Sequence, residues 1–373
     1  MDSRPTAPVS LTPRAARPPR TRRQFIDLAL QGGGSHGAFT WGVLDRLLQD
    51  ETLEIAGVSG TSAGAMNAVA LAAGLMAGGR EGARENLGRF WRRVAQASPF
   101  HPLEMGPLAA LWGPDNPWLA AWTTPWRQAA GWLGSQLSPY QLNPLNLNPL
   151  RDVLRETVDF ERVCGCNKTQ LFIAATQVRT GALRIFRQHE VSIEVVLASA
   201  CLPLLFQAVE IEGEAYWDGG YAGNPTLLPL IQESPADDLL LVQINPSLRD
   251  ELPTRADAIL DRINEVTFNA SLLKEMRSIA LLQQLIAEEE PARRRRNPLL
   301  RRIATLRTHR VDGGQALGAL GAGTKTQSQW PFLSMLFDRG VEAADRWLHE
   351  NRRHIGRRST LDLGQAFGPP TGA

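Results

Sequence analysis

Ser62 has the sequence environment of a catalytic nucleophile. It is the central residue of Gly60-Thr61-Ser62-Ala63-Gly64, a G-x-S-x-G pattern that lies between an apolar run at 53–58 and a helical pattern. Small residues on both sides allow the sharp strand-to-helix turn that exposes a serine hydroxyl, and the helix dipole favours negative charge that develops there. The same residues also fit a glycine-rich turn whose serine caps a helix, and the pattern alone does not separate the two interpretations.

A second glycine-rich segment, Gly32-Gly33-Gly34-Ser35-His36-Gly37, follows the apolar run Phe25 to Gln31. Its spacing fits the G-x-G-x-x-G pattern of a dinucleotide-binding loop, but that interpretation needs an acidic residue at the end of the second strand to bind the ribose. The second strand instead runs into Ser59-Gly60. Backbone N–H groups at a helix N-terminus would also bind an oxyanion. We therefore favour an oxyanion hole over a nucleotide site, with Gly32, Gly33 and Gly34 as its residues.

A serine nucleophile needs a base, and Asp218 is the candidate. Asp218-Gly219-Gly220 follows a short strand that contains Tyr216 and Trp217, and the two glycines allow a close turn. Histidine is the usual partner of a catalytic serine. The histidines that follow Ser62 lack the small neighbours of a catalytic turn, and we expect them at the surface: His189, His309, His349 and His354.

The position of Ser62 in the chain distinguishes between two hydrolase architectures. Several strands precede the nucleophile of a standard α/β-hydrolase, and a histidine follows late in the chain to complete a triad. Here only one expected strand and one expected helix precede Ser62. The early serine, the glycine loop before it and the later Asp-Gly-Gly therefore predict a dyad of Ser62 and Asp218.

In this order, the segments 32–37, 60–64 and 218–220 resemble the motifs of the patatin-like phospholipase family. The resemblance extends to 198–206 (ASACLPLLF) and covers about 26–246, followed by a C-terminal extension like that of some bacterial members. It implies a lipid acyl hydrolase of the phospholipase A type, with an acyl-enzyme intermediate, no cofactor and no metal for catalysis. Under this interpretation the residues that support the motifs are Gly37, Gly60, Gly64, Gly219 and Gly220.

One residue departs from the family pattern. His36 stands where the glycine loop commonly carries arginine, so the loop lacks a permanently charged side chain. A catalytically silent binding or scaffold protein with the same fold is therefore the alternative hypothesis. The large C-terminal region favours that alternative, and the three intact motifs oppose it.

The elements expected around these motifs form an α/β fold, which the resemblance specifies as a three-layer α/β/α fold with a mostly parallel sheet. Strand, loop and helix alternate twice before residue 80, which is typical of parallel strands. The runs 171–177 and 183–187 predict a hairpin around Arg179-Thr180-Gly181. Two short strands are expected on either side of Glu212-Gly213-Glu214, and 239–244 is a further buried strand.

The expected domain organisation has four parts. Residues 1–24, rich in Pro and Arg, form a disordered tail without the apolar segment of a secretory signal. The catalytic domain covers 25–246 and includes a Trp- and Pro-rich insertion at about 90–149, in which Trp118, Trp122 and Trp126 are either core residues or a membrane-facing lid. A helical C-terminal extension covers 247–355, and 356–373 is a second disordered tail.

Composition limits the partners. With 40 basic and 38 acidic residues, the formal charge of +2 gives no reason to expect nucleic-acid binding. Three cysteines (Cys164, Cys166 and Cys201) are too few for a disulfide framework and lack the spacing of a zinc site, so we expect a reducing, cytoplasmic location. No apolar run is long enough to span a bilayer. Any membrane contact is therefore expected to be peripheral, through the lipid or other acyl-ester substrate.

Overall fold

A computed structural model describes residues 23–97, 138–249, 251–290 and 296–367. Within these residues the strands form one eight-stranded sheet in the order β5-β6-β3-β2-β1-β7-β8, with β4 beside β3. Strands β1, β2, β3, β7 and β8 run parallel to one another, and the pairs that include β4, β5 or β6 are antiparallel. The strands are β1 Gln24–Leu30, β2 Leu53–Gly60, β3 Gln170–Gln177, β4 Leu183–Arg187, β5 Val209–Ile211, β6 Glu214–Asp218, β7 Asp238–Gln243 and β8 Arg307–Asp312.

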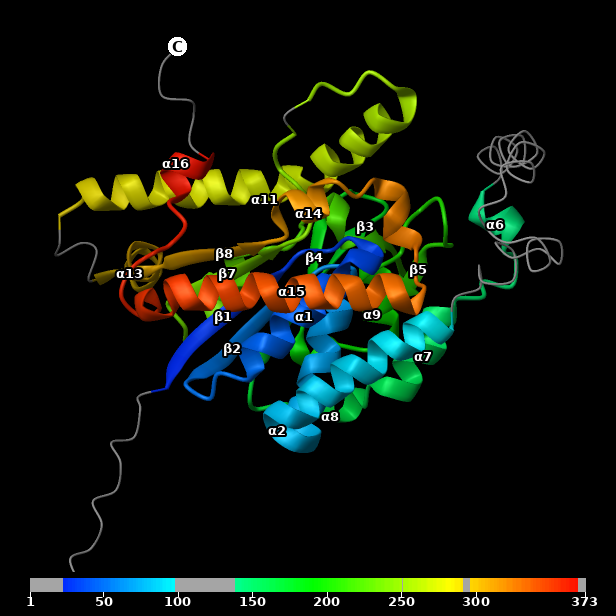
Figure 1. Ribbon diagram of the computed structural model, residues 1–373, viewed down its shortest axis with the longest axis horizontal. Helices are drawn as coiled ribbons and strands as arrows, with labels where there is room; N and C mark the ends of the chain where they lie inside the picture. The colour runs from blue at the N-terminus through cyan, green and yellow to red at the C-terminus, as the bar shows by residue number, and fades with distance from the viewer. Residues whose placement is uncertain (1–22, 98–137, 250, 291–295, 368–373) are drawn as a thin grey trace, which may run out of the picture.

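Helices cover both faces of this sheet. One layer contains α1 Gly37–Leu48, α2 Ala63–Gln96, α7 Pro149–Thr157, α8 Phe160–Cys164, α9 Ile193–Ser199 and α15 Trp330–Asn351. The opposite layer contains α10 Leu228–Glu233, α11 Ala256–Glu288, α13 Pro298–Thr305 and α16 Leu363–Phe367. In Figure 1, α11 and α16 lie above the strands, and α2, α7 and α8 lie below them. The expected three-layer α/β/α fold is confirmed.

The central strands are apolar on both sides because both faces are covered. On β1, Ile26, Leu28 and Leu30 enter the core under α1 and α2, whereas Ala29 enters the core under α11. Asp27 also points to the α11 side, where Oδ1 of its carboxyl group accepts a hydrogen bond from the Ser234 hydroxyl. Burial raises the pKa of Asp27 to about 8, so this carboxyl group is neutral at pH 7.

The C-terminal extension is helical as expected, but it also completes the sheet. Strand β8 pairs in parallel with β7 over its whole length, and α15 packs across α1 in the core. The prediction that 356–373 is a disordered tail is wrong for 356–367, because Leu361, Leu363 and Phe367 are buried in the α11 layer. The shorter elements are α6 Pro139–Leu142, α14 Gly314–Gly318, η1 Gly34–His36, η2 Gln188–Glu190, η3 Gly219–Tyr221, η4 Ala322–Thr326 and η5 Arg352–His354.

The structure contradicts the predicted start of the insertion at about residue 90. Helix α2 continues through residue 90, and Phe90 and Trp91 are buried in the core, where the Trp91 indole donates to Asn67 Oδ1 at 3.0 Å. Trp118, Trp122 and Trp126 lie outside the described residues, so their role stays a prediction. No helix in the described part of the chain is both long enough and apolar enough to cross a bilayer. Cys164, Cys166 and Cys201 are free thiols.

Helices α1 and α15 approach each other so closely that only glycine fits at their contact. A Cβ atom at Gly340 would lie 2.1 Å from the carbonyl oxygen of Phe39, and one at Gly42 would lie 2.0 Å from that of Phe337. Real Cβ atoms do not approach backbone oxygens this closely, so an added methyl group would force the helices apart.

We therefore expect Gly340→Ala to lower the free energy of unfolding by about 2 kcal/mol, measured by urea denaturation. Gly318→Ala is the matched control, because a Cβ atom there meets open space, and it should leave the midpoint unchanged. Equal stability of the two variants would show that α1 and α15 are not in backbone contact.

Candidate active site

Ser62 sits at a strained turn between β2 and α2. Its backbone has φ 55° and ψ −121°, a left-handed φ that non-glycine residues rarely adopt. Although Ser62 occupies the N-cap position of α2, its side chain makes no capping hydrogen bond. The capping interpretation of the serine is therefore excluded by the geometry, and its hydroxyl is free for chemistry.

Several contacts hold this turn in place. The N–H of Ser62 donates to the hydroxyl of Ser199 at 2.9 Å, and the hydroxyl of Thr61 donates to the carbonyl oxygen of Gly223 at 2.7 Å. The glycine loop presses against the turn, since a Cβ atom at Gly32 would lie 2.8 Å from the Cβ of Ser62. A side chain at Gly32 would therefore displace the serine.

Strand β3 aligns Ser62 with Asp218. This strand lies between β2 and β6. Its residue Ile173 pairs with Gly60 of β2, and its residue Ala175 pairs with Asp218 of β6. The turn after Asp218 also reaches the serine turn, because a Cβ atom at Gly219 would lie 3.0 Å from Thr61 Cγ2. The two segments that the sequence separates by more than 150 residues thus meet at the same edge.

The carboxylate of Asp218 is fully buried, with 0% exposure. Oδ1 accepts the N–H of Gly220 at 2.7 Å, whereas Oδ2 has no partner with hydrogen-bond geometry among the described residues. Burial raises the pKa of Asp218 to about 7, against the lowering effects of the Gly220 N–H, the Ser62 hydroxyl and the charge of Lys325. The Ser62 hydroxyl thus interacts with the carboxylate without a fully formed hydrogen bond. An acid in this state can gain or lose a proton near neutral pH.

The oxyanion hole needs one correction. The N–H of Gly32 already donates to Asn224 Oδ1 at 2.6 Å, so Gly32 is not a free donor. Its carbonyl oxygen accepts from Asn245 Nδ2 at 2.7 Å. No hydrogen bond within the described residues uses the N–H of Gly33 or Gly34, and these two groups remain candidate donors. Gly32 instead anchors the loop.

His36 does not supply the positive charge that an arginine at this position of the glycine loop would carry. Its ring is buried, and Nε2 lies 2.7 Å from the hydroxyl of Thr324 in η4. Burial, together with the nearby charge of Lys325, lowers the pKa of His36 to about 4. The imidazole is therefore neutral at pH 7, and no fixed charge comes from this position of the glycine loop.

The surface prediction for the later histidines is wrong for His309. This residue lies on β8 with 0% exposure, and its ring nitrogens face Asp238 Oδ1 at 3.0 Å and Thr360 Oγ1 at 2.8 Å. Both nitrogens are thus engaged at the β7–β8 pair, where they cannot serve Ser62. His189 and His349 are exposed, and His354 is partly exposed.

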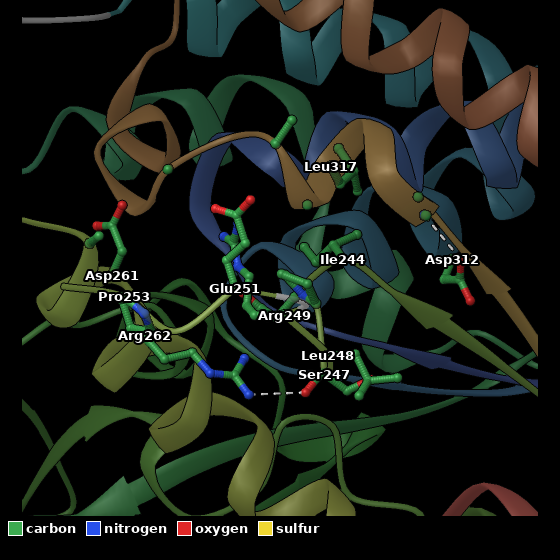
Figure 2. Close-up of a pocket in the computed structure, with 18 of the residues that line it drawn as sticks. Ile244, Ser247, Leu248, Arg249, Glu251, Pro253, Asp261, Arg262, Asp312 and Leu317 are labelled. Atoms are coloured by element: carbon green, nitrogen blue, oxygen red, sulfur yellow. Dashed lines mark hydrogen bonds between the residues drawn. The ribbon is translucent and has the colours of Figure 1, made fainter. Parts of the chain in front are cut away.

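A cavity of about 820 Å³ lies next to the glycine loop, and neither Ser62 nor Asp218 lines it. Ile244, which packs against Gly33, forms part of its wall. Figure 2 shows Asp261 and Arg262 on one side of this cavity and Leu317 and Asp312 on the other. Its charges are largely neutralised, since Arg262 binds Glu265 and Arg310 binds Asp312. We assign it no role in the chemistry.

Sequence reasoning missed the residues that hold the motifs together. Asn224 binds the N–H of Gly32 and also donates to the carbonyl oxygen of Phe268 on α11 at 3.1 Å. Ser199 lies inside the segment 198–206 that the resemblance covered, and Asn224 lies four residues after Gly220. Their proximity to recognised motifs was the one available signal. Their roles follow from contacts that only the folded chain creates.

Comparison with known proteins gave one family. The model described as patatin-like phospholipase matches residues 28–231, which include the glycine loop, Ser62 and Asp218. Among solved structures, the crystal structure of VipD from Legionella pneumophila matches with 15% identity and a TM-score of 0.42, over 88% of this chain and 67% of that one. No curated protein matches the sequence.

At neutral pH, burial of the Asp218 carboxylate should lower the free energy of unfolding, compared with a protein that has a neutral side chain at this position. The unfolded chain ionises Asp218 near its ordinary pKa of 3.8, whereas the folded chain holds the proton up to about 7. The free energy of unfolding therefore falls as the pH rises from about 4 to about 7, and it stays nearly constant above that range. Asp218→Asn keeps the acceptor for Gly220 and removes the charge.

We expect Asp218→Asn to raise Tm by about 3 °C at pH 8, with a gain that shrinks as the pH approaches 4. Calorimetry at several pH values measures this. A lower Tm for the variant at pH 8 would contradict the burial of an ionised carboxylate at this position.

Proposed function

The chain belongs to the patatin-like phospholipase family, and from this premise we propose that it is a serine acyl hydrolase with Ser62 as nucleophile and Asp218 as general base. One observation carries the proposal. The Ser62 hydroxyl makes no capping bond, and it interacts with the fully buried carboxylate of Asp218, whose Oδ2 has no hydrogen-bond partner of good geometry among the described residues. A free hydroxyl next to such a carboxylate is the minimum that nucleophilic catalysis by serine requires.

In the proposed acylation step, Asp218 Oδ2 takes the proton of Ser62 as Oγ attacks the ester carbonyl carbon. The carbonyl π electrons move to the oxygen, and the N–H groups of Gly33 and Gly34 stabilise that oxyanion together with the N-terminal end of α1. When the tetrahedral intermediate collapses, the bond to the leaving alcohol breaks. Asp218 then returns the proton to the alcohol oxygen, and the acyl group stays on Ser62.

Deacylation repeats the sequence with water as the nucleophile. Asp218 removes a proton from the water molecule, the hydroxyl adds to the acyl carbonyl, and the ester bond to Ser62 breaks. The proton returns to Ser62 Oγ, which restores the resting site. A pKa of about 7 suits both directions of proton transfer at neutral pH.

Exposed apolar side chains near Asp218 support a lipid substrate and peripheral contact with a membrane. The loop after α9 begins at Cys201, whose carbonyl oxygen accepts the N–H of Asp218 at 2.8 Å. Within that loop Leu204 is 82% exposed and Leu205 49% exposed, and Tyr221 follows the aspartate turn with 42% exposure. Apolar side chains held in water beside a reactive site favour an acyl chain or a bilayer surface.

We expect Ser62→Ala to reduce kcat/KM for p-nitrophenyl butyrate by at least about 1000-fold and to abolish labelling by a fluorophosphonate probe. Asp218→Asn should lose activity to a similar extent, because the hydroxyl would then lack its base. Ser278→Ala, an exposed position on α11, is the control and should keep both activity and labelling.

Full activity in Ser62→Ala would eliminate the proposed nucleophile. A folded wild-type protein that neither hydrolyses esters nor takes up the probe would instead favour the catalytically silent scaffold.

We also expect the double variant Leu204→Ser, Leu205→Ser to hydrolyse phospholipid vesicles at least about ten-fold more slowly, because even partial transfer of two leucines out of water, at about 1.5–3 kcal/mol for each full transfer, exceeds the roughly 1.4 kcal/mol of a ten-fold effect. Hydrolysis of soluble p-nitrophenyl butyrate should change by less than about two-fold, since the dyad is intact. Leu285→Ser on α11, with 50% exposure, is the control. Unchanged vesicle hydrolysis in the double variant would argue against membrane contact through this loop.

A further inference from the structure

The C-terminal extension reaches the candidate active site through the short helix η4. Gly34 packs so closely on this segment that a Cβ atom there would lie 2.3 Å from the carbonyl oxygen of Lys325. Beside this contact, the hydroxyl of Thr324 meets the ring of His36. Residues 324–325 therefore form a wall of the glycine loop, although they lie far beyond the segment that carries the motifs.

The ammonium group of Lys325 points from this wall toward the aspartate turn. Its Nζ donates to Asn264 Oδ1 at 2.8 Å and lies 5.6 Å from the ring centre of Phe268. Phe268 in turn packs on Gly220, where a Cβ atom would lie 2.3 Å from the ring. Lys325 thus lies between the glycine loop and the turn that begins at Asp218.

Within the described part of the chain, this cation has no direct counterion. No carboxylate among the described residues lies within ion-pair distance of Lys325 Nζ, and the side chain is mostly buried. The charged groups that act on it are Glu265 and Asp261 of α11 and Asp218 of the site. Glu265 already binds Arg249 and Arg262, and His36 on the other side is neutral. Asp218 acts on the ammonium less strongly than Glu265 and Asp261 do, but of the three it is the carboxylate that belongs to the proposed dyad.

We propose that Lys325 is a positioning residue of the active site, a cation supplied by the C-terminal extension that keeps Asp218 ionised and ready to accept the proton of Ser62. The inference rests on the proposed function of the dyad. Its basis is geometric: a mostly buried ammonium without an ion pair to any described residue, held by Asn264 and Phe268 beside the aspartate turn, on a segment that packs against Gly34.

The position also fits the movement of charge during acyl transfer. The negative charge begins on Asp218 and passes to the oxyanion when the serine attacks. A cation whose backbone touches Gly34 and whose ammonium faces the aspartate turn stays close to the charge in both states. Burial lowers the pKa of Lys325 to about 8, so this assistance is present at neutral pH and is lost as the pH rises through about 8.

The test compares Lys325→Met, Lys325→Arg and wild type in the pH profile of kcat/KM for p-nitrophenyl butyrate. Loss of the cation should raise the pKa of Asp218 further and move the acidic limb upward by about half a pH unit. Lys325→Met should then lose about three-fold in kcat/KM at pH 6 and approach wild type at pH 9. Lys325→Arg should restore the acidic limb, and Lys274→Met at an exposed position of α11 should match wild type.

A loss of activity that is equal at all pH values, or one that arginine does not rescue, would assign Lys325 a packing role and overturn the proposal. An unchanged profile in Lys325→Met would overturn it as well.

A second measurement does not depend on activity, so it separates this proposal from the proposed function. Thermal unfolding at pH 7.5 of wild type, Lys325→Met, Asp218→Asn and the double variant forms a double-mutant cycle. If the ammonium stabilises the carboxylate, Asp218→Asn should raise Tm by about 2 °C more in the Lys325→Met background than in wild type. An equal gain in both backgrounds would show no coupling and would refute the inference, even if the wild-type protein proves inactive.

Discussion

The arrangement of this protein depends on keeping one carboxylate away from water. The Asp218 carboxylate is fully buried, yet from the described residues it accepts only one hydrogen bond of good geometry, so its charge is held at a cost in folding stability. Burying such a group requires tight cover from every side. The close approach of Gly219 to β3 and of Gly220 to Phe268 supplies that cover and leaves no room for side chains in the turn. The glycines of the third motif are thus a consequence of the burial.

The cover on one side comes from the C-terminal extension, so the extension is part of the same fold as the candidate active site. Phe268 of α11 closes the aspartate turn, Asn269 of the same helix binds Gln31 at 2.8 Å before the glycine loop, and η4 closes the loop itself. At the other end, β8 extends the sheet and α15 packs on α1. The family match ends at residue 231, whereas the packing that completes the site continues to Lys325 and beyond.

The sequence predicted the features that are local. Apolar runs gave β1, β2 and β3, and the order of three glycine-rich motifs gave the fold family and the candidate dyad. Strand β8 was missed because RTHRVD contains one apolar residue, Val311, among charged and polar ones, and His309 becomes buried only when Asp238 and Thr360 enclose it. The use of the Gly32 N–H by Asn224 and the contact of Lys325 with the glycine loop join residues far apart in the chain. Local patterns carry no information on such contacts.

In the proposed function an aspartate takes the place of histidine, and the surroundings of Asp218 correct both shortcomings of an aspartate as a base. An exposed aspartate ionises near pH 4 and has little affinity for the serine proton at pH 7, whereas burial moves the pKa of Asp218 to about 7, into the range of an imidazole. A histidine base also needs a third residue to orient it. Asp218 is instead oriented by backbone groups. Its N–H donates a hydrogen bond to the carbonyl oxygen of Cys201, and its Oδ1 accepts one from the N–H of Gly220. The proposed dyad therefore needs no third residue, because the turn itself supplies the orientation.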